Sequence, residues 1–218
     1  TTMVLAKPNK KVNILRNNFL IISLFHFFLT SGQSKQQYKI WYTNFSKVQF
    51  SDPVLSKKYL DSILRIPQLA DSLTSKTYND VGIYNAVIGD YKEAIHYFTK
   101  SFYFDKATSN QTKANILCNI ANTQKMQGDF DRALLNLNKA KKIYTALKEQ
   151  KNIFKVDSEL SAIYYYKLDY NKALEISSVL IQKLTDVADL KLLNIQLIRH
   201  ANILYNIGDY RNAIVNFK

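Results

Sequence analysis

The stretch GDYKEAIHYF at residues 89–98 decides the fold, because close variants of it recur along the chain. They are GDFDRALLNL at 128–137, LDYNKALEIS at 168–177 and GDYRNAIVNF at 208–217. Each copy has an alanine at the same place, and these alanines are 39, 40 and 40 residues apart: Ala94, Ala133, Ala173 and Ala213. A fixed period of this length indicates a repeat protein, in which similar units are stacked in a row.

Each repeat is predicted to contain two amphipathic helices joined by a tight corner. In KTYNDVGIYNAVIGDYKEAIHYFTKSF (76–102), apolar and small residues recur at three- and four-residue steps on both sides of Gly89 and Asp90. Gly89 ends the first helix, since glycine adopts the left-handed conformation without a Cβ penalty. Asp90 then accepts the free amides at the start of the second helix. The small Ala94 allows the two helices to approach closely, and Phe98 lies one turn further on the same face.

The first helix of every unit also has a small residue seven positions before the corner. These residues are Gly82, Ala121, Ser161 and Ala201. A single helix pair cannot bury its wide apolar face alone, so each pair must pack against its neighbour. The sequence therefore predicts an all-α fold in which helix pairs stack as a solenoid.

These residues resemble the tetratricopeptide repeat family, whose pattern has a small residue in the first helix, a Gly-Asp-Tyr-type corner and an alanine followed by an aromatic residue. The resemblance extends over residues 76–218 and implies a right-handed superhelical solenoid of antiparallel helix pairs. It also implies a concave face, lined by the first helices, that binds peptides or proteins. The period is longer than the usual value of about 34, and it resembles the extended repeats of bacterial signalling receptors.

Other departures from the family pattern concern single residues. No unit carries the family's tryptophan, no proline closes a unit, and Leu168 replaces the corner glycine in the third. We expect Leu168 to give a strained or differently closed corner.

We expect the chain to be organised as a leader, a terminal helix pair and repeats. The segment SDPVLSKKYLDSILRIPQL suggests a degenerate pair, because Asp52 and Pro53 form a plausible helix start and Ser56 lies 38 residues before Ala94. The predicted boundaries are 1–32 for the leader, 33–66 for a degenerate repeat or cap, and 67–106, 107–147, 148–186 and 187–218 for the repeats, the last one truncated.

The first residues have the pattern of a secretory signal peptide. KPNKKVNILRNN (7–18) is basic, FLIISLFHFFL (19–29) is apolar apart from Ser23 and His26, and small residues precede Gln33. The apolar stretch is shorter than the roughly 20 residues of a membrane-spanning helix. Export to the periplasm, free or anchored in the membrane, is therefore predicted. An uncleaved signal anchor and a buried helix of the folded domain are the alternatives.

Composition favours a role without nucleic acid. The formal net charge is +13, but the basic residues are scattered among acids and no RRM, KH or helix-turn-helix signature accompanies them. An RNA-binding helical array stays an alternative, and it predicts binding that weakens steeply with salt.

The sequence shows no catalytic, cofactor or metal motif. It lacks a Gly-rich phosphate loop, HExxH, CxxC and GxSxG. The single cysteine, Cys118, is not spaced with His26, His96 or His200 as a zinc site requires. The corner acids are interpreted as helix caps: Asp90, Asp129, Asp169 and Asp209. We therefore expect a protein that is not an enzyme and that needs neither cofactor nor metal.

The helix faces implied by the resemblance give a candidate peptide-binding groove. Asparagine can hold an extended peptide backbone, tyrosine offers a flat contact surface, and Lys125 could meet a carboxylate. An ordinary solvated face is the alternative. The chaperone-tail clamp needs Lys and Asn one turn apart in one helix, whereas Asn79 and Ile83 occupy those places, so such a tail is disfavoured. The candidate groove residues are Asn79, Ile83, Asn122, Lys125, Tyr165, Tyr166, Asn202 and Tyr205.

The predicted function is that of an exported interaction module, the sensing region of a larger bacterial signalling protein, with a protein or peptide ligand. The chain ends inside the last predicted helix, so we expect it to be the front of a longer protein. In the proteins it resembles, a membrane helix and a kinase or DNA-binding output domain often follow. A cytosolic regulator that binds signalling peptides or response regulators is the alternative.

Overall fold

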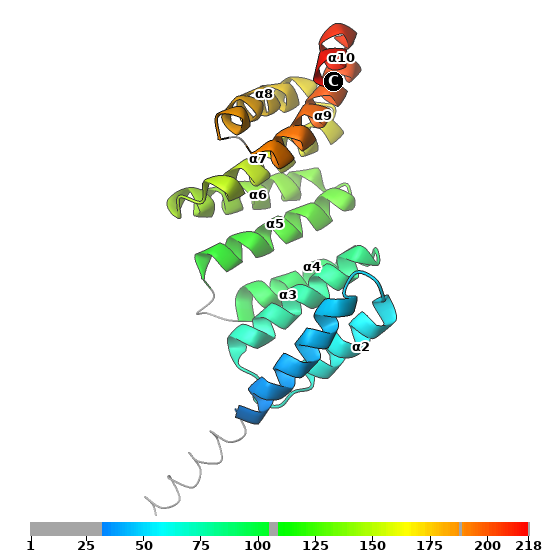
Figure 1. The fold of residues 1–218 in the computed structure, drawn as a ribbon, viewed down its shortest axis with the longest axis vertical. Helices are drawn as coiled ribbons and strands as arrows, with labels where there is room; N and C mark the ends of the chain where they lie inside the picture. The colour runs from blue at the N-terminus through cyan, green and yellow to red at the C-terminus, as the bar shows by residue number, and fades with distance from the viewer. Residues whose placement is uncertain (1–31, 105–108, 188, 218) are drawn as a thin grey trace, which may run out of the picture. The chain divides into compact units, whose positions relative to one another are not determined.

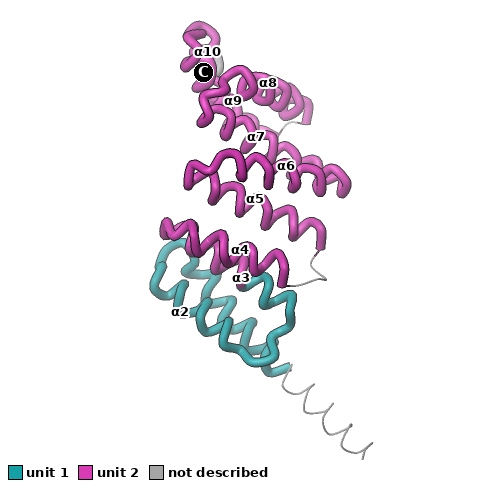
Figure 2. The backbone as a smooth tube through the Cα atoms, turned by 180° about the vertical axis from the view of Figure 1, so that it is seen from behind, with its two compact units in different colours: residues 1–77 teal, residues 78–218 magenta. Residues whose placement is uncertain are grey.

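The computed structural model describes residues 32–104, 109–187 and 189–217. All regular secondary structure in these ranges is α-helical, so the predicted all-α class is confirmed. The apolar stretch over residues 19–29 lies outside the described part. The chain divides into two compact units, residues 1–77 and residues 78–218, and the boundary falls inside helix α3 (Asp71–Val87) (Figure 2).

In the first unit, residues 32–48 are helical and are followed by α2 (Pro53–Leu64). Asp52 caps α2, where its Oδ1 accepts a 2.9 Å hydrogen bond from the Leu55 amide. Pro53 occupies the first helical position, where its missing N–H costs nothing. Ile63 is buried with Tyr38 in a cluster on which Trp41 and Tyr42 pack.

The second unit is a row of helices in which chain neighbours are also neighbours in space (Figure 1). Within it, α5 packs on α6 and α7 on α8, and each second helix then contacts the first helix of the next pair. The first helix α7 also contacts α5 and α9 directly. The helices are α4 (Tyr91–Phe104), α5 (Asn110–Met126), α6 (Phe130–Ala146), α7 (Gln150–Tyr166), α8 (Tyr170–Asp186), α9 (Leu190–Asn206) and α10 (Tyr210–Phe217).

The corners between paired helices have the predicted geometry. Gly89 has a φ of 87°, in the left-handed region, and Asp90 Oδ1 accepts a 3.2 Å hydrogen bond from the Glu93 amide. The other corner acids also accept the amide three residues on, which confirms that they are helix caps: Asp129, Asp169 and Asp209. Leu168 has a φ of 63°, so a branched side chain occupies a conformation that favours glycine.

The small residues of the first helices allow close packing. Gly82 is buried, and a Cβ atom at this position would lie 2.5 Å from the Phe98 ring. The equivalent residues of the later repeats are also buried: Ala121, Ser161 and Ala201. A large apolar cluster joins α5, α6 and α7, and it includes Ala133, Leu160 and Ile163. This core fixes the spacing of the first helices, on which the candidate site lies.

Candidate functional site

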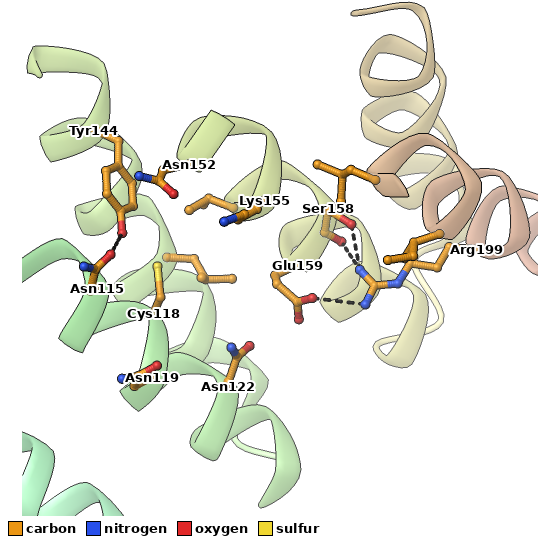
Figure 3. A pocket seen from close by; sticks show the side chains of 14 residues that line it. Asn115, Cys118, Asn119, Asn122, Tyr144, Asn152, Lys155, Ser158, Glu159 and Arg199 are labelled. Atoms are coloured by element: carbon orange, nitrogen blue, oxygen red, sulfur yellow. Dashed lines mark hydrogen bonds and ion pairs between the residues drawn. The ribbon is translucent and has the colours of Figure 1, made fainter. Parts of the chain in front are cut away.

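A cavity of about 420 Å³ lies on the first helices α5, α7 and α9, with two side chains contributed by α6; we call it the large cavity (Figure 3). Polar side chains, several of them asparagines, line it together with a few aliphatic ones. The lining residues are Asn115, Cys118, Asn119, Asn122, Leu137, Tyr144, Asn152, Lys155, Val156, Ser158, Glu159, Leu192, Ile195 and Arg199.

A second cavity of about 110 Å³, the small cavity, is formed by the same first helices. Its walls combine two cations with two tyrosine rings. The lining residues are Lys125, Ser161, Ala162, Tyr165, Tyr166, Arg199, Asn202 and Ile203. Arg199 lines both cavities, so its side chain is shared by the two.

One carboxylate, Glu159 of α7, holds two cations from the neighbouring first helices. Its Oε2 pairs with Lys125 Nζ of α5, and its Oε1 accepts a 3.0 Å hydrogen bond from Arg199 Nη2 of α9. Burial raises the pKa of the Glu159 carboxyl, but the charges and hydrogen bonds of Lys125 and Arg199 outweigh this effect and hold the pKa below its usual value. Glu159 is therefore ionised at neutral pH and connects three successive repeats.

Buried polar groups fix the position of Arg199. Its Nη1 donates to the Ser158 carbonyl at 3.0 Å and to Ser158 Oγ at 2.7 Å. Ser158 Oγ in turn donates to Gln196 Oε1 at 2.8 Å, and both Ser158 and Gln196 are buried. Figure 3 shows the guanidinium directed toward Ser158 and Glu159. Because its position is set by the protein, Arg199 is preorganised for a ligand.

The opposite end of the large cavity contains a tyrosine, an asparagine and a thiol (Figure 3). Tyr144 donates to Asn115 Oδ1 at 2.5 Å. Burial raises the pKa of the Cys118 thiol to about 11, so the thiol is protonated at neutral pH. Burial also raises the pKa of Tyr144. A protonated thiol is a poor nucleophile, so this end of the cavity offers contact surface and hydrogen bonds.

The structure gathers five of the eight candidate groove residues at the two cavities. Asn122 lines the large cavity, and four line the small cavity: Lys125, Tyr165, Tyr166 and Asn202.

The other three candidates line neither cavity. Asn79 accepts a 3.0 Å hydrogen bond from Asn119, and Ile83 packs against the apolar cluster that contains Phe98. Tyr205 is exposed, with its ring 5.2 Å from that of Tyr210.

Two charged residues of the site, Glu159 and Arg199, were not predicted from the sequence. Glu159 and Arg199 are separated by 40 residues, which is one repeat period, and they occupy equivalent positions of α7 and α9. Opposite charges one period apart could have indicated a bond between neighbouring first helices. Other polar lining residues that were missed include Asn115, Asn119, Asn152 and Lys155.

The remaining titratable groups of the described residues were compared with the requirements of a metal site. In the described ranges, no group of three or more His, Cys, Asp or Glu side chains is placed to hold a metal ion. His96 is exposed, whereas His200 Nδ1 lies 2.6 Å from Ser177 Oγ and burial lowers its pKa. Over the same ranges, none of the helices combines the length and the apolar character needed to cross a membrane.

Comparison with known proteins defines the class of this fold. A family model for the tetratricopeptide repeat matches residues 73–146. RapI in its apo form superposes with a TM-score of 0.73 at 11% identity, over 83% of this chain and 67% of RapI. The repeats of a putative kinesin light chain from Podosopora anserina give a TM-score of 0.66 at 12% identity, over 85% of this chain and 92% of that one.

A further similar structure is that of NprR in complex with its cognate peptide NprX, with a TM-score of 0.66 at 19% identity, over 84% of this chain and 53% of NprR. No curated protein matches significantly. Residues 73–146 thus match the tetratricopeptide repeat model, and the superpositions show that the chain has the fold of tetratricopeptide-like repeat proteins.

Proposed function

We propose that this chain is a non-catalytic scaffold that binds a protein or peptide at the large and small cavities. The observation that carries the proposal is that Arg199 lines both cavities, whose walls come from three successive first helices. A ligand that spans both cavities would contact three repeats at once. The complex of NprR with the peptide NprX supports the proposal, because a protein of similar fold holds a peptide.

The side chains at the cavities suit a peptide ligand. Asn122 and Asn202 are exposed, and each amide group offers both a donor and an acceptor. A peptide backbone presents the same two groups in alternation, so asparagine can satisfy both. Tyr166 is also exposed and offers a flat ring at low cost in conformational entropy. The asparagine amides can therefore bind the main chain of a peptide, and the tyrosine ring can pack against its apolar side chains.

A peptide array tests this function. The purified chain is applied to an array of random dodecapeptides, and the affinities of the peptides that bind are measured by fluorescence anisotropy. Asn122→Ala combined with Asn202→Ala should weaken binding about tenfold, since two polar contacts are lost. Asn171→Ala, at an exposed position on α8, is the matched control. Absence of any bound peptide, or equal losses in the control, would contradict the proposal.

We also propose that this scaffold is the exported sensing or interaction region of a larger bacterial signalling protein. The support is the basic segment at 7–18 followed by the apolar stretch at 19–29. The test is to express the full chain in bacteria, fractionate the cells and determine the mass of its N-terminal peptide. Recovery from the periplasm or the membrane is expected. Recovery from the cytoplasm with the leader intact would favour the cytosolic regulator instead.

A further inference from the structure

We propose that one edge of the second unit docks on an anionic membrane surface. This edge, the connection edge, consists of the ends of α4, α6 and α8 and the starts of α5, α7 and α9, which are the links between successive repeats. Figure 1 shows these links on one side of the row of helices and the corners between paired helices on the other. The inference goes beyond the proposed function, because it uses no residue that lines the large or the small cavity.

The connection edge and the corners differ in charge. The segments at the links contain ten lysines and four acidic residues, whereas those at the corners contain five basic and six acidic residues. The link segments are 99–113, 139–151 and 183–191. The corner segments are 88–93, 127–132, 167–172 and 207–212. The connection edge therefore has an excess of positive charge, which attracts an anionic surface.

The link between α6 and α7 has most of this excess charge. Residues 139–151 contain five lysines and a single acid, Glu149. Lys142, Lys148 and Lys151 are exposed, and none of them takes part in an ion pair within the described ranges. At the link between α8 and α9, two aspartates offset two lysines, so that link is neutral. An anionic surface is therefore expected to bind most strongly at the α6–α7 link.

Helix stability does not explain the lysines at the links. The N-terminus of a helix is stabilised by acids and destabilised by cations. The helices α4 and α6, which begin at corners, follow this rule, with Glu93 and Asp131 in their first turns. The helices α7 and α9, which begin at links, have no acid in the first turn and have Lys151 and Lys191 at the second helical position. These two lysines therefore fit a role in binding better than a role in folding.

At each of the three links, an exposed apolar side chain lies within three positions of an exposed lysine. The pairs are Tyr103 with Lys100, Leu147 with Lys148, and Leu190 with Lys191. Phe104 and Val187 are further exposed apolar residues at the first and third links. A bilayer surface satisfies both kinds of group, because its anionic headgroups attract the lysines and its interfacial region takes up aromatic and aliphatic side chains.

The aliphatic side chains favour a bilayer over a nucleic acid as the partner. Lysines alone would suit either polyanion. Single-stranded nucleic acid binds through bases that stack on flat rings, but Leu147 and Val187 offer no such ring. An anionic membrane surface is the partner that uses the lysines and the exposed apolar residues together.

The test measures contact at the connection edge itself, because the basic and apolar residues at 7–29 could also meet a bilayer. Leu147→Trp is made in the full chain together with Trp41→Phe, which removes the single native tryptophan, so the fluorescence reports the α6–α7 link alone. Ile207→Trp in the same background is the matched control. Leu147 and Ile207 both follow the last residue of a helix and are 41% and 43% exposed, but Ile207 lies at a corner.

Both proteins are titrated with vesicles of equimolar phosphatidylcholine and phosphatidylglycerol, and with vesicles of phosphatidylcholine alone. The tryptophan at 147 should shift to shorter wavelength and be quenched by brominated lipid on the anionic vesicles only, since contact needs the negative headgroups. Raising the salt concentration should reverse the shift. The tryptophan at 207 should not respond to either kind of vesicle.

Charge variants in the Leu147→Trp protein test the role of the lysines. Lys142→Gln combined with Lys151→Gln should weaken the affinity for anionic vesicles about twentyfold, because each lysine near such a surface contributes about fivefold. Lys92→Gln combined with Arg211→Gln removes the same charge from exposed positions at two corners and should have no effect. Thermal melts confirm that each variant is folded.

Several outcomes would overturn the inference. They are an unchanged tryptophan at 147 on anionic vesicles, an equal response at 207, an equal response on phosphatidylcholine alone, and equal losses in the two charge variants. A response of the tryptophan at 147 to single-stranded DNA but not to vesicles would assign the edge to nucleic acid instead. None of these results bears on peptide binding at the cavities, so failure here leaves the proposed function standing.

Discussion

The two faces of helix α7 differ sharply although their residues alternate along the sequence. Leu160 and Ile163 are buried in the apolar cluster shared with α5 and α6. Lys155 and Glu159 line the large cavity, where Glu159 pairs with cations of α5 and α9. Adjacent residues thus belong to different environments, as expected for a helix with 3.6 residues per turn.

The difference means that stability and binding can be changed separately. Burial of apolar surface is the main stabilising term and does not depend on a ligand. Partly exposed ion pairs stabilise a fold only slightly, yet the same charges can dominate the choice of ligand. Changes on the apolar face should therefore alter melting, and changes on the polar face should alter binding.

The largest effect is expected on the apolar face. Ile163→Ala should lower the free energy of unfolding by about 2–5 kcal/mol, because it leaves a cavity in a fully buried cluster. Asn122→Ala on the exposed polar face should change it by less than about 0.5 kcal/mol. Chemical denaturation of both variants provides the measurement. Equal losses of unfolding free energy in the two variants would show that the apolar face does not contribute more to stability than the polar face.

A second prediction concerns the contact between Gly82 and Phe98. Gly82→Ala should destabilise the fold by about 1–3 kcal/mol despite the better helix propensity of alanine, since its Cβ would lie 2.5 Å from the Phe98 ring. The second repeat has Ala121 and Leu137 at the equivalent positions. Combining Gly82→Ala with Phe98→Leu should therefore recover part of the loss in a thermal melt. A higher melting temperature for Gly82→Ala alone would show that the contact is not tight.

A third prediction tests the corner that lacks glycine. Leu168→Gly should leave stability unchanged or raise it by up to about 1 kcal/mol, because it relieves a left-handed conformation at a φ of 63°. Gly128→Leu makes the reverse change at an equivalent corner and should lower the melting temperature. A clear loss on Leu168→Gly would mean that the leucine side chain contributes packing that outweighs the strain.

The smallest effect is expected from the ion pairs of Glu159. Its pKa is lower in the folded chain than its ordinary value of 4.5, so the stabilisation is complete above that value and is lost as the pH falls through the folded pKa. Relative to Glu159→Gln, the native chain should be more stable by at most about 1 kcal/mol at neutral pH. Melts at decreasing pH should show this difference shrinking. A difference that grows in acid would contradict the assigned sign.

The parts of this molecule that could be predicted from sequence are those set by local interactions. The corner at Gly89 and Asp90 depends on residues within one turn, so its left-handed glycine and its helix cap were both predictable. The site was harder to predict. Lys125 and Asn122 were expected from their helix faces, whereas Arg199 was missed because its role depends on Ser158 and Glu159 of another repeat.

By itself, the sequence determined the repeat period, the helix pairs and the stacking of successive units, because helix periodicity, caps and small residues act over a few positions. Only the tertiary structure decided that Glu159 joins Lys125 and Arg199, and that Arg199 lines both the large and the small cavity. Those contacts connect residues 34 and 40 positions apart. Their geometry exists only once the apolar cores have fixed the distance between neighbouring first helices.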